Sequence, residues 1–230
     1  MVYTTTSANQ SVQLTYRKQY FEYIETEDGV EDLSESGALN HTFGNVGEHK
    51  VKVLFKKGLT SLYNCFRECT GLTSIPSDLF VNNPEVTNFN VCFYGCSGLT
   101  SLPSDLFVNN TKITEFGSCF FGCTGLTSIP DGLFANNPEV TSFSYCFSGC
   151  TGLSSIPNDL FVNNTKVISF GSCFAHCTGL TSSTPLDNDG TPLYNRSEGK
   201  DGYSVVKYYD NCFYKCTLMS DYSSIPSGWK

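Results

Sequence analysis

Residues 146–157 read Cys-Phe-Ser-Gly-Cys-Thr-Gly-Leu-Ser-Ser-Ile-Pro, and close variants of this stretch recur along most of the chain. The pattern Cys-Phe-x-x-Cys occurs six times, with four intervals of 27 residues followed by one of 39 residues. Leucine, proline and phenylalanine positions outside the cysteine pattern keep the same 27-residue step. A fixed period of roughly 20 to 50 residues indicates a repeat architecture, in which each repeat packs on its neighbours.

Each repeat is predicted to form one coil. Its Leu-Thr-Ser-Ile segment, as at 72–75, favours a short strand that ends at the following proline, because proline cannot donate to a strand ladder. Its Asp-Leu-Phe-x-Asn-Asn segment favours a single helical turn, and the apolar spacing of Val-x-x-Phe-x-x-Cys-Phe favours a second one. In a stack of such coils, each row of leucine, phenylalanine and cysteine becomes a column of core contacts.

The stretch from Cys146 to Pro157 resembles the BspA-type leucine-rich repeat, also called the Treponema pallidum type. Over residues 58–182 this resemblance implies an α+β repeat solenoid, a leucine-rich-repeat-like right-handed coil of 27-residue units with short strands and helical turns. Here Cys-Phe-x-x-Cys replaces the family's usual Ala-Phe-x-x-Cys, and the period is longer than the family's. Members of the family are surface, adhesive or uncharacterised proteins, common in gut Bacteroidetes and their phages.

The two ends of the chain depart from the repeat. Residues 1–57 are predicted to form a β cap or attachment domain, with strands at 12–16, 20–24 and 50–55 and a turn at Asp28-Gly29. The segment 41–51 resembles the end of a PKD-like β-sandwich repeat, although the tryptophan and the full Gly-Asp-Gly turn of that family are missing. Residues 183–230 are predicted to form a loop insert and a degenerate capping repeat, in which Trp229 closes the core.

The twelve cysteines form six pairs at the same phase of the repeat. A zinc site would need two further ligands for each pair, and a disulfide within each pair is a second alternative. Free cysteine packs as a small hydrophobic residue, so we favour a buried structural ladder without metal or cofactor. This ladder comprises Cys65, Cys69, Cys92, Cys96, Cys119, Cys123, Cys146, Cys150, Cys173, Cys177, Cys212 and Cys216.

The sequence contains no known catalytic or ion-binding pattern. The three histidines, His41, His49 and His176, have no partner at catalytic spacing, and His176 is predicted to be exposed. The acidic residues between Glu22 and Glu35 lack the spacing of a calcium-binding EF-hand, which favours a solvated loop. We therefore predict that the protein is not an enzyme.

Function is expected at positions that vary while the scaffold repeats. The x-x pair of Cys-Phe-x-x-Cys is one such place, and Tyr94 and Phe121 are predicted to lie one coil apart there as an aromatic strip. The candidate binding surface comprises Arg67, Tyr94, Phe121, His176 and Tyr214. The Thr-Ser rows of the other face are polar and flat, and they are either an alternative surface or neutral filler. A further row alternates in charge from coil to coil: Glu85, Lys112, Glu139 and Lys166.

The composition of the chain argues against two classes of interaction, with nucleic acid and with the interior of a membrane. The net charge of −8 argues against nucleic acid as the main partner, and the chain lacks the run of about 18 apolar residues that predicts a membrane span. Residues 1–7 lack the basic and apolar segments of a signal peptide, which indicates either that a signal was removed or that none is used.

These observations together predict a non-catalytic protein on an exterior surface that recognises a protein or glycan partner. One placement is as a virion component of a phage that infects gut bacteria. The alternative placement is as a secreted or cell-surface adhesin of a gut Bacteroidetes bacterium. We also expect a homo-oligomer, or attachment to a larger assembly through residues 1–57.

Overall fold

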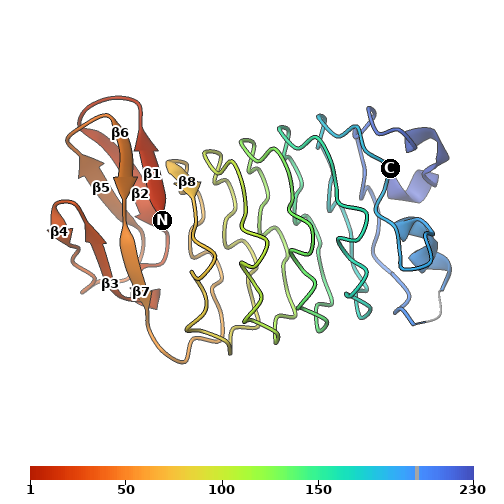
Figure 1. The fold of residues 1–230 in the computed structure, drawn as a ribbon, viewed down its shortest axis with the longest axis horizontal. Coiled ribbons are helices and arrows are strands. Elements are labelled where there is room, and N and C mark those ends of the chain that lie inside the picture. Colours follow the sequence, from red (N-terminus) through yellow and green to blue (C-terminus); the bar gives the residue numbers. More distant parts are fainter. Residues whose placement is uncertain (200–201) are drawn as a thin grey trace.

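The computed structural model describes residues 1–199 and 202–230. The molecule is elongated, with antiparallel strands at one end, stacked coils of chain along its length, and the C-terminal segment at the other end (Figure 1). The N-terminal strands pack on the first coil and the C-terminal segment packs on the last, so one core runs through the whole length.

Small antiparallel sheets are formed by strands of the first 57 residues together with one strand of the first coil. The strands are β1 (Val2–Thr5), β2 (Gln10–Thr15), β3 (Phe21–Thr26), β4 (Gly29–Val30), β5 (Leu39–Phe43), β6 (Gly47–Lys50), β7 (Lys52–Phe55) and β8 (Leu72–Ser74). The strand orders are β6-β1-β8, β2-β5 and β4-β3-β7. The predicted strands near 12–16, 20–24 and 50–55 are confirmed as β2, β3 and β7. The turn between β3 and β4 is Glu27-Asp28, one residue before the predicted Asp28-Gly29.

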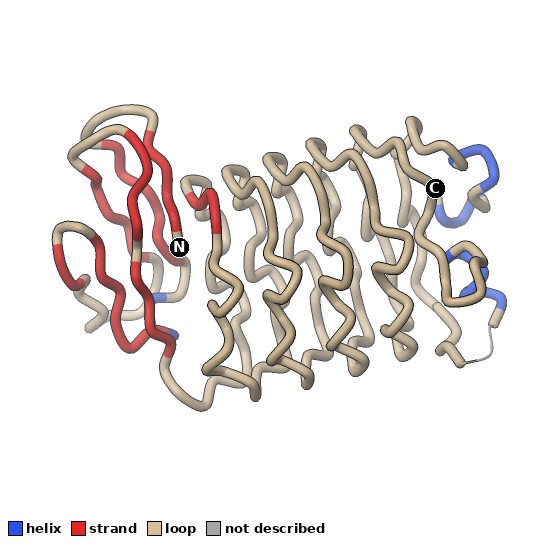
Figure 2. Tube along the Cα trace, in the orientation of Figure 1, coloured by secondary structure: helices blue, strands red, loops and turns tan. Residues whose placement is uncertain are grey.

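The predicted α+β solenoid of short strands and helical turns is wrong. Helical structure in the described residues is limited to four short 3₁₀ segments, none of them in 58–182. The sheets are small and antiparallel, and none of them forms a solenoid. Figure 2 shows the coils almost entirely as loops and turns. The 3₁₀ segments are η1 (Lys18–Tyr20), η2 (Leu193–Glu198), η3 (Tyr222–Ser224) and η4 (Ser227–Trp229).

Local hydrogen bonding explains why the expected elements are missing. In the first repeat the predicted helical turn is a set of separate turns, in which Leu79 N–H donates to the Pro76 carbonyl (3.3 Å) and Asn83 N–H to the Phe80 carbonyl (3.0 Å). Starting a helix is unfavourable, and such short segments gain too few bonds to repay it. The predicted strand at 72–75 is the strand β8 because β1 pairs with it. Its counterparts in later coils have no such partner strand.

Successive 27-residue coils nevertheless lie against one another. Isolated parallel bridges join Ser61 to Asn88, Asn88 to Glu115, Glu115 to Ser142, Ser142 to Ser169, and Ser169 to Tyr208. Around them, alternate N–H groups of one coil donate to carbonyls of the next, as from Phe66 to Cys92 (2.7 Å) and from Phe93 to Cys119 (2.8 Å). We call this set of bonds the inter-coil ladder.

Two residues with positive φ interrupt the backbone in each of these segments. One precedes the first cysteine of the pair and the other precedes the second, as with Ser118 (φ 54°) and Gly122 (φ 68°). Left-handed residues redirect the chain and cannot continue a strand. The Cys-Phe-x-x-Cys segment is therefore a fixed series of bends, which the repeat spacing alone does not reveal.

The core is a set of aligned columns. The phenylalanines of Cys-Phe-x-x-Cys stack from coil to coil, with ring centroids 5.3 Å apart between Phe66 and Phe93 and 5.5 Å apart between Phe93 and Phe120. Trp229 is 1% exposed and stacks on Tyr209 at 5.0 Å. The prediction that Trp229 closes the core is confirmed.

A buried asparagine column runs beside the aromatic core. Asn110, Asn137 and Asn164 each donate their side-chain amide to the asparagine carbonyl one coil earlier, at 2.8, 3.0 and 2.9 Å. At the end of the column Arg196 takes over this role and donates to the Asn164 carbonyl (3.3 Å). The insert was predicted as a loop or hairpin on the edge of the repeats, but η2 buries Leu193 and Arg196. The insert is thus part of the C-terminal cap.

Candidate binding face

The side chains at the first x of Cys-Phe-x-x-Cys form one surface column. Tyr94 and Phe121 stack in parallel with ring centroids 4.7 Å apart and an interplanar angle of 3°. The Arg67 guanidinium lies 5.2 Å from the centre of the Tyr94 ring and 5.6 Å from that of Tyr16, which follows β2. We call Tyr16, Arg67, Tyr94 and Phe121 the aromatic row. Three of the five predicted site residues are thus brought together in it.

The next two coils interrupt this row with small residues. Ser148 and Ala175 occupy the same column position, and both are buried. The Ser148 hydroxyl donates to the Ala175 carbonyl (3.1 Å), so it belongs to the scaffold. A shallow hollow of about 570 Å³ opens over these two residues. We call it the hollow, and it is lined by Phe121, Tyr145, Ser148, Ser172, Ala175, His176, Asn211 and Tyr214.

Aromatic side chains resume at the far side of the hollow. His176 and Tyr214 meet edge to face with ring centroids 5.3 Å apart. Tyr145 is 49% exposed and Tyr214 is 40% exposed. The structure therefore places all five predicted site residues on one face, as two groups separated by the hollow.

Several polar groups around the hollow have no partner in the protein. Within the described residues, no hydrogen bond uses the side-chain polar atoms of Ser172, His176 or Asn211, nor the hydroxyls of Tyr145 and Tyr214. Exposed groups of this kind bond to water in the free protein and are available to a ligand.

The twelve cysteines lie inside the molecule. All of them are buried and free. From the second repeat on, the second cysteine of each pair donates its S–H to a phenylalanine carbonyl of the preceding coil, as Cys96 does to Phe66 (3.0 Å) and Cys216 to Phe174 (2.9 Å). Burial raises the pKa of the Cys123 and Cys216 thiols to about 12. Thiols with raised pKa values are poor nucleophiles at neutral pH. In the described part of the chain, no group of three or more histidine, cysteine or acidic residues is arranged to hold a metal ion.

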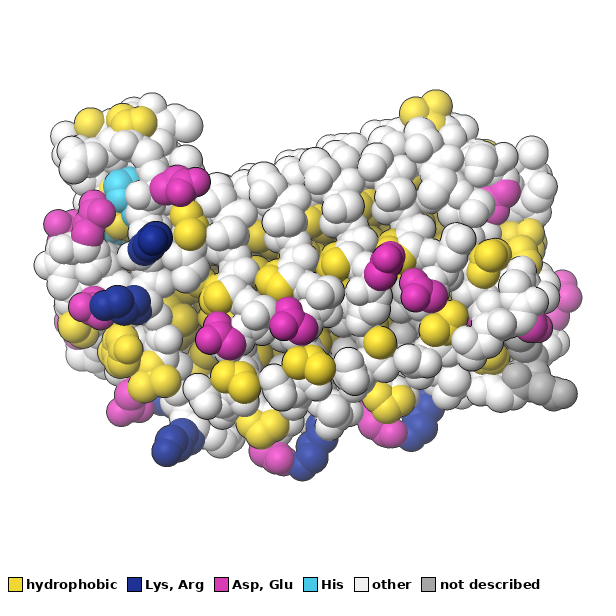
Figure 3. Space-filling model, in the orientation of Figure 1, with side chains coloured by type: hydrophobic (Ala, Val, Ile, Leu, Met, Phe, Trp, Pro, Cys, Tyr) yellow, Lys and Arg dark blue, Asp and Glu magenta, His cyan; other side chains and the backbone are white. Residues whose placement is uncertain are grey.

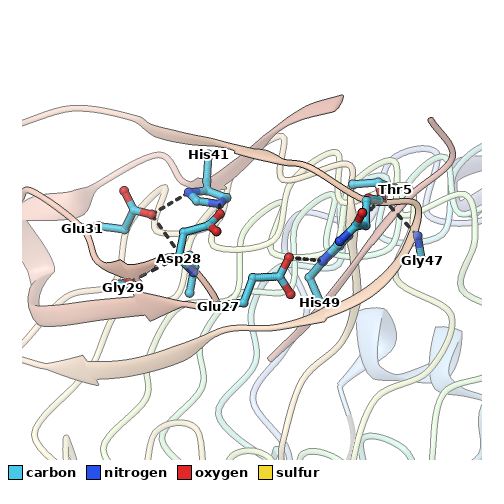
Figure 4. A network of polar contacts seen from close by, with 10 residues as sticks. Thr5, Glu27, Asp28, Gly29, Glu31, His41, Gly47 and His49 are labelled. Atoms are coloured by element: carbon cyan, nitrogen blue, oxygen red, sulfur yellow. Dashed lines mark hydrogen bonds and ion pairs between the residues drawn. The ribbon is translucent and has the colours of Figure 1, made fainter. Parts of the chain in front are cut away.

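Two histidines of the N-terminal strands form a polar network with the acidic turn (Figure 4). His41 lies between Glu31 (Nδ1 to Oε1, 2.7 Å) and Asp28 (Nε2 to Oδ2, 3.0 Å). His49 contacts Glu27 through Nδ1 (3.2 Å) and Thr5 through Nε2 (3.0 Å). The prediction of a solvated acidic loop is confirmed for Glu27 and Asp28, whose side chains are 45% and 63% exposed, whereas Glu31, at 17%, is partly buried beside His41 because folding brings β5 beside the turn.

The order Thr5, His49, Glu27 resembles a hydroxyl, imidazole and carboxylate triad in its spacing. The Thr5 hydroxyl, however, donates to the Asn45 carbonyl (2.9 Å) and accepts from Gly47 N–H (3.3 Å). It is also buried, with 2% of the residue exposed. A nucleophile must reach its substrate and give its proton to the base, and this hydroxyl does neither. The network ties the turn to β1, β5 and β6.

The row of alternating charges forms ion pairs within two-coil units. Lys112 contacts Glu85 and Lys166 contacts Glu139, each at 2.6 Å. Within the described residues, Lys112 and Glu139 form no ion pair although they are also one coil apart. Adjoining basic and acidic side chains line the lower edge of the molecule in Figure 3. Pairs this exposed add little stability.

Sequence reasoning missed Tyr145, Ser172 and Asn211. They occupy the position before the first cysteine, which also varies between repeats: Asn64, Val91, Ser118, Tyr145, Ser172 and Asn211. That variation was the available signal. The bend that turns Tyr145 outward (φ 59°) has no signature in the sequence.

No family model matches the chain, and no curated protein matches it. The resemblances to BspA-type repeats and to PKD-like sandwiches therefore stay predictions. Among the described residues, none of the helices has the length and apolar character needed to span a bilayer.

Proposed function

We propose that the protein is a non-catalytic recognition protein on an exterior surface, which binds its protein or glycan partner through the aromatic row and the hollow. The observation that carries this proposal is the hollow itself. Its lining is rich in tyrosine, serine and asparagine, the residue types that antibody loops use for adaptable recognition, and all of its polar side chains except Ser148 form no hydrogen bond within the described residues.

The opposite Thr-Ser rows support this choice of face by contrast. In three coils the hydroxyl at the first position of the pair bonds to the preceding coil, from Thr127 to the Thr100 carbonyl (3.4 Å), from Ser154 to the Thr127 carbonyl (3.2 Å) and from Thr181 to the Ser154 carbonyl (3.2 Å). A side chain that already bonds to the neighbouring coil has less to offer a partner. These rows are better explained as links between coils.

The placement on a surface rests on the resemblance to BspA-type proteins. A virion component of a phage of gut bacteria is the first candidate, and a cell-surface adhesin of a gut Bacteroidetes bacterium is the alternative. Immunogold labelling of intact phage particles and of intact cells separates the two. Labelling of neither sample would overturn display on an exterior surface.

Binding is tested with fluorescently labelled protein on intact cells of gut Bacteroidetes, read by flow cytometry. We expect the double variant Phe121→Ser/Tyr214→Ser to lose cell labelling. The control variant Glu85→Gln/Lys112→Gln changes two exposed residues on another edge and should label cells like the wild type. Equal cell labelling by the two variants would show that the binding site does not lie on this face.

A further inference from the structure

We propose that the hollow binds a neutral saccharide, with a sugar ring stacked on the free face of Phe121. This inference rests on the proposed function, because it names the partner class of the same face. It is carried by the shape of the hollow, by the chemistry of its lining and by its lack of charge.

The shape follows from the interruption of the aromatic row. One face of the Phe121 ring is covered by Tyr94 at 4.7 Å, and the next two coils present Ser148 and Ala175 instead of a ring. Hydrogen-bonded neighbouring segments lie about 4.8 Å apart, so three steps separate Phe121 from Tyr214 by about 14 Å. The gap has room for one or two sugar rings. Its volume of about 570 Å³ is typical of small-ligand sites.

The lining combines flat apolar surfaces with free hydrogen-bonding groups. A pyranose has C–H faces that pack on aromatic rings and hydroxyls around its edge that need polar partners. Phe121, Tyr145 and Tyr214 offer the rings, while Ser172, His176 and Asn211 offer uncommitted donors and acceptors. An aromatic side chain of a protein partner would fill the space but leave these polar groups desolvated and unpaired, which is unfavourable.

The charge distribution favours a neutral sugar over an acidic one. No aspartate, glutamate, lysine or arginine lines the hollow. One cation outside the lining, Lys215, lies 5.4 Å from the centre of the Tyr214 ring. The chain carries a net charge of −8, which repels anionic ligands. Uronic acids, sialic acids and nucleotides are therefore disfavoured.

One rim residue replaces a glycine of the repeat. The residue before the second cysteine is glycine in three consecutive coils, at Gly95, Gly122 and Gly149, all with positive φ. In the coil that lines the hollow it is His176, with φ 62°. Glu68 and Lys215 hold the same position with φ 59° and 63° in other coils, so the backbone conformation itself is not confined to the hollow. What the replacement adds here is an exposed imidazole at the edge of the hollow.

The test uses the full chain and four disaccharides as probes: cellobiose, lactose, mannobiose and, as the acidic probe, digalacturonate. Binding is measured by calorimetry and saturation-transfer NMR. We expect at least one neutral disaccharide to bind with a dissociation constant of about 1 mM or tighter, and digalacturonate to bind more weakly.

The main variant is Ser148→Tyr, which extends the aromatic row into the hollow. The same column position holds tyrosine at Tyr94, so the scaffold accommodates the substitution. We expect it to weaken saccharide binding at least about tenfold, with a slightly lower urea midpoint because the hydrogen bond from the Ser148 hydroxyl to the Ala175 carbonyl is lost. We expect Phe121→Ser to weaken binding as well. The control Glu85→Gln/Lys112→Gln should bind like the wild type.

Three results would overturn the inference. The first is that digalacturonate binds and no neutral disaccharide does. The second is that Ser148→Tyr binds a neutral disaccharide as well as the wild type does. The third is no neutral binding at all. If the third result accompanies cell labelling that Phe121→Ser/Tyr214→Ser abolishes, the saccharide inference fails while the proposed function stands.

Discussion

Along the Cys-Phe-x-x-Cys segments, the first coil of the stack presents backbone carbonyls to its N-terminal neighbour, whereas the last coil presents N–H groups to its C-terminal neighbour. This difference arises because the inter-coil bonds of these segments run from an N–H of one coil to a carbonyl of the next. Buried backbone groups without partners are costly, so each end needs its own solution. The two solutions differ in how many residues share the task.

At the N-terminal end, several separate donors bond to the carbonyls of the first coil. Tyr16 N–H and the Thr15 hydroxyl both donate to the Cys65 carbonyl, at 2.9 and 2.6 Å. The Gln13 amide donates to the Arg67 carbonyl (2.5 Å). Because these bonds are separate, the loss of one leaves the others in place.

The C-terminal end concentrates the task. The Gly228 and Trp229 carbonyls accept the ladder bonds of the last coil, at 3.2 and 2.7 Å. Arg196 alone closes the asparagine column and is paired with Asp187 at 2.9 Å, and both side chains are almost fully buried. We therefore expect single substitutions to reduce stability less in the N-terminal cap than in the C-terminal cap.

The largest destabilisation of both ends is expected at alkaline pH, because the thiols it ionises run along the whole stack. Burial raises the pKa of eleven cysteine thiols, from Cys65 to Cys216. A raised pKa gives stability that is complete below the unfolded value near 9 and is lost as pH rises toward the folded value. At pH 10 each thiol costs about 1.4 kcal/mol, together about 15 kcal/mol. This equals the whole stability of a typical domain.

We therefore expect cooperative unfolding near pH 10, measured by circular dichroism. Full protection of the twelve thiols from alkylation at pH 10 would contradict this expectation. If hydrogen exchange shows that both caps lose amide protection at the same pH, the two caps belong to one cooperative unit.

The largest effect of a single substitution is expected at the C-terminal end. Arg196→Met breaks the buried ion pair with Asp187 and removes a donor from two carbonyls, Asn164 and Phe161. Breaking a buried ion pair costs about 3–5 kcal/mol, so the urea midpoint should fall sharply. The double variant Arg196→Met/Asp187→Leu removes the buried carboxylate as well and should recover part of the loss. A double variant no more stable than the single one would show that the carbonyls, not the charge, dominate.

Glycine substitutions compare an interior coil with the first coil. A Cβ on Gly125 would lie 2.5 Å from the Ser97 carbonyl oxygen, which is backbone, whereas a Cβ on Gly71 would meet a methyl group of the Val12 side chain at 3.0 Å. Forcing an atom into a packed interior costs about 1–3 kcal/mol. We expect Gly125→Ala to lose about 3 kcal/mol and Gly71→Ala at most about 1 kcal/mol, both by urea unfolding. Equal losses would mean that the cap packs as tightly as a coil.

Much of this arrangement could be predicted from the period of the sequence. The 27-residue step places the cysteine, phenylalanine and leucine rows in the core, and the phase of Pro226 places Trp229 at the end of that core. These inferences succeed because side chains at equal phase must meet in any stack. They do not depend on the local backbone conformation.

The local conformation and the ends could not be predicted in this way. The bends at Tyr145 and His176 depend on positive φ values, which are uncommon for residues other than glycine. Propensity therefore suggested strands and helical turns where the chain forms bends. Arg196 lies in an insert without any period, so only the folded structure shows that it completes the asparagine column. The hollow likewise depends on the folded structure, because it forms where coils with small residues lie beside bends that carry exposed side chains.

Smaller effects are expected from the N-terminal donors. Gln13→Leu removes one bond to the Arg67 carbonyl, and Thr15→Val removes one of the two bonds to the Cys65 carbonyl. A single hydrogen bond contributes about 0.5–1.5 kcal/mol, so each variant should lose about 1 kcal/mol in urea unfolding. A loss as large as that of Arg196→Met would abolish the contrast between a distributed and a concentrated cap.

The smallest expected effect is a gain. His176 and Glu68 both occupy, with positive φ, a position where other coils have glycine, but only His176 lies at the hollow. Relief of left-handed strain is worth about 1 kcal/mol, so His176→Gly and Glu68→Gly should each raise the urea midpoint slightly. Glu68→Gly also loses an exposed ion pair with Arg67 (3.1 Å), so its gain should be the smaller one. If cell labelling falls only in His176→Gly, the strain at the hollow serves binding. If it falls in neither variant, His176 is only a strained surface residue and the contribution of the hollow rests on its aromatic walls.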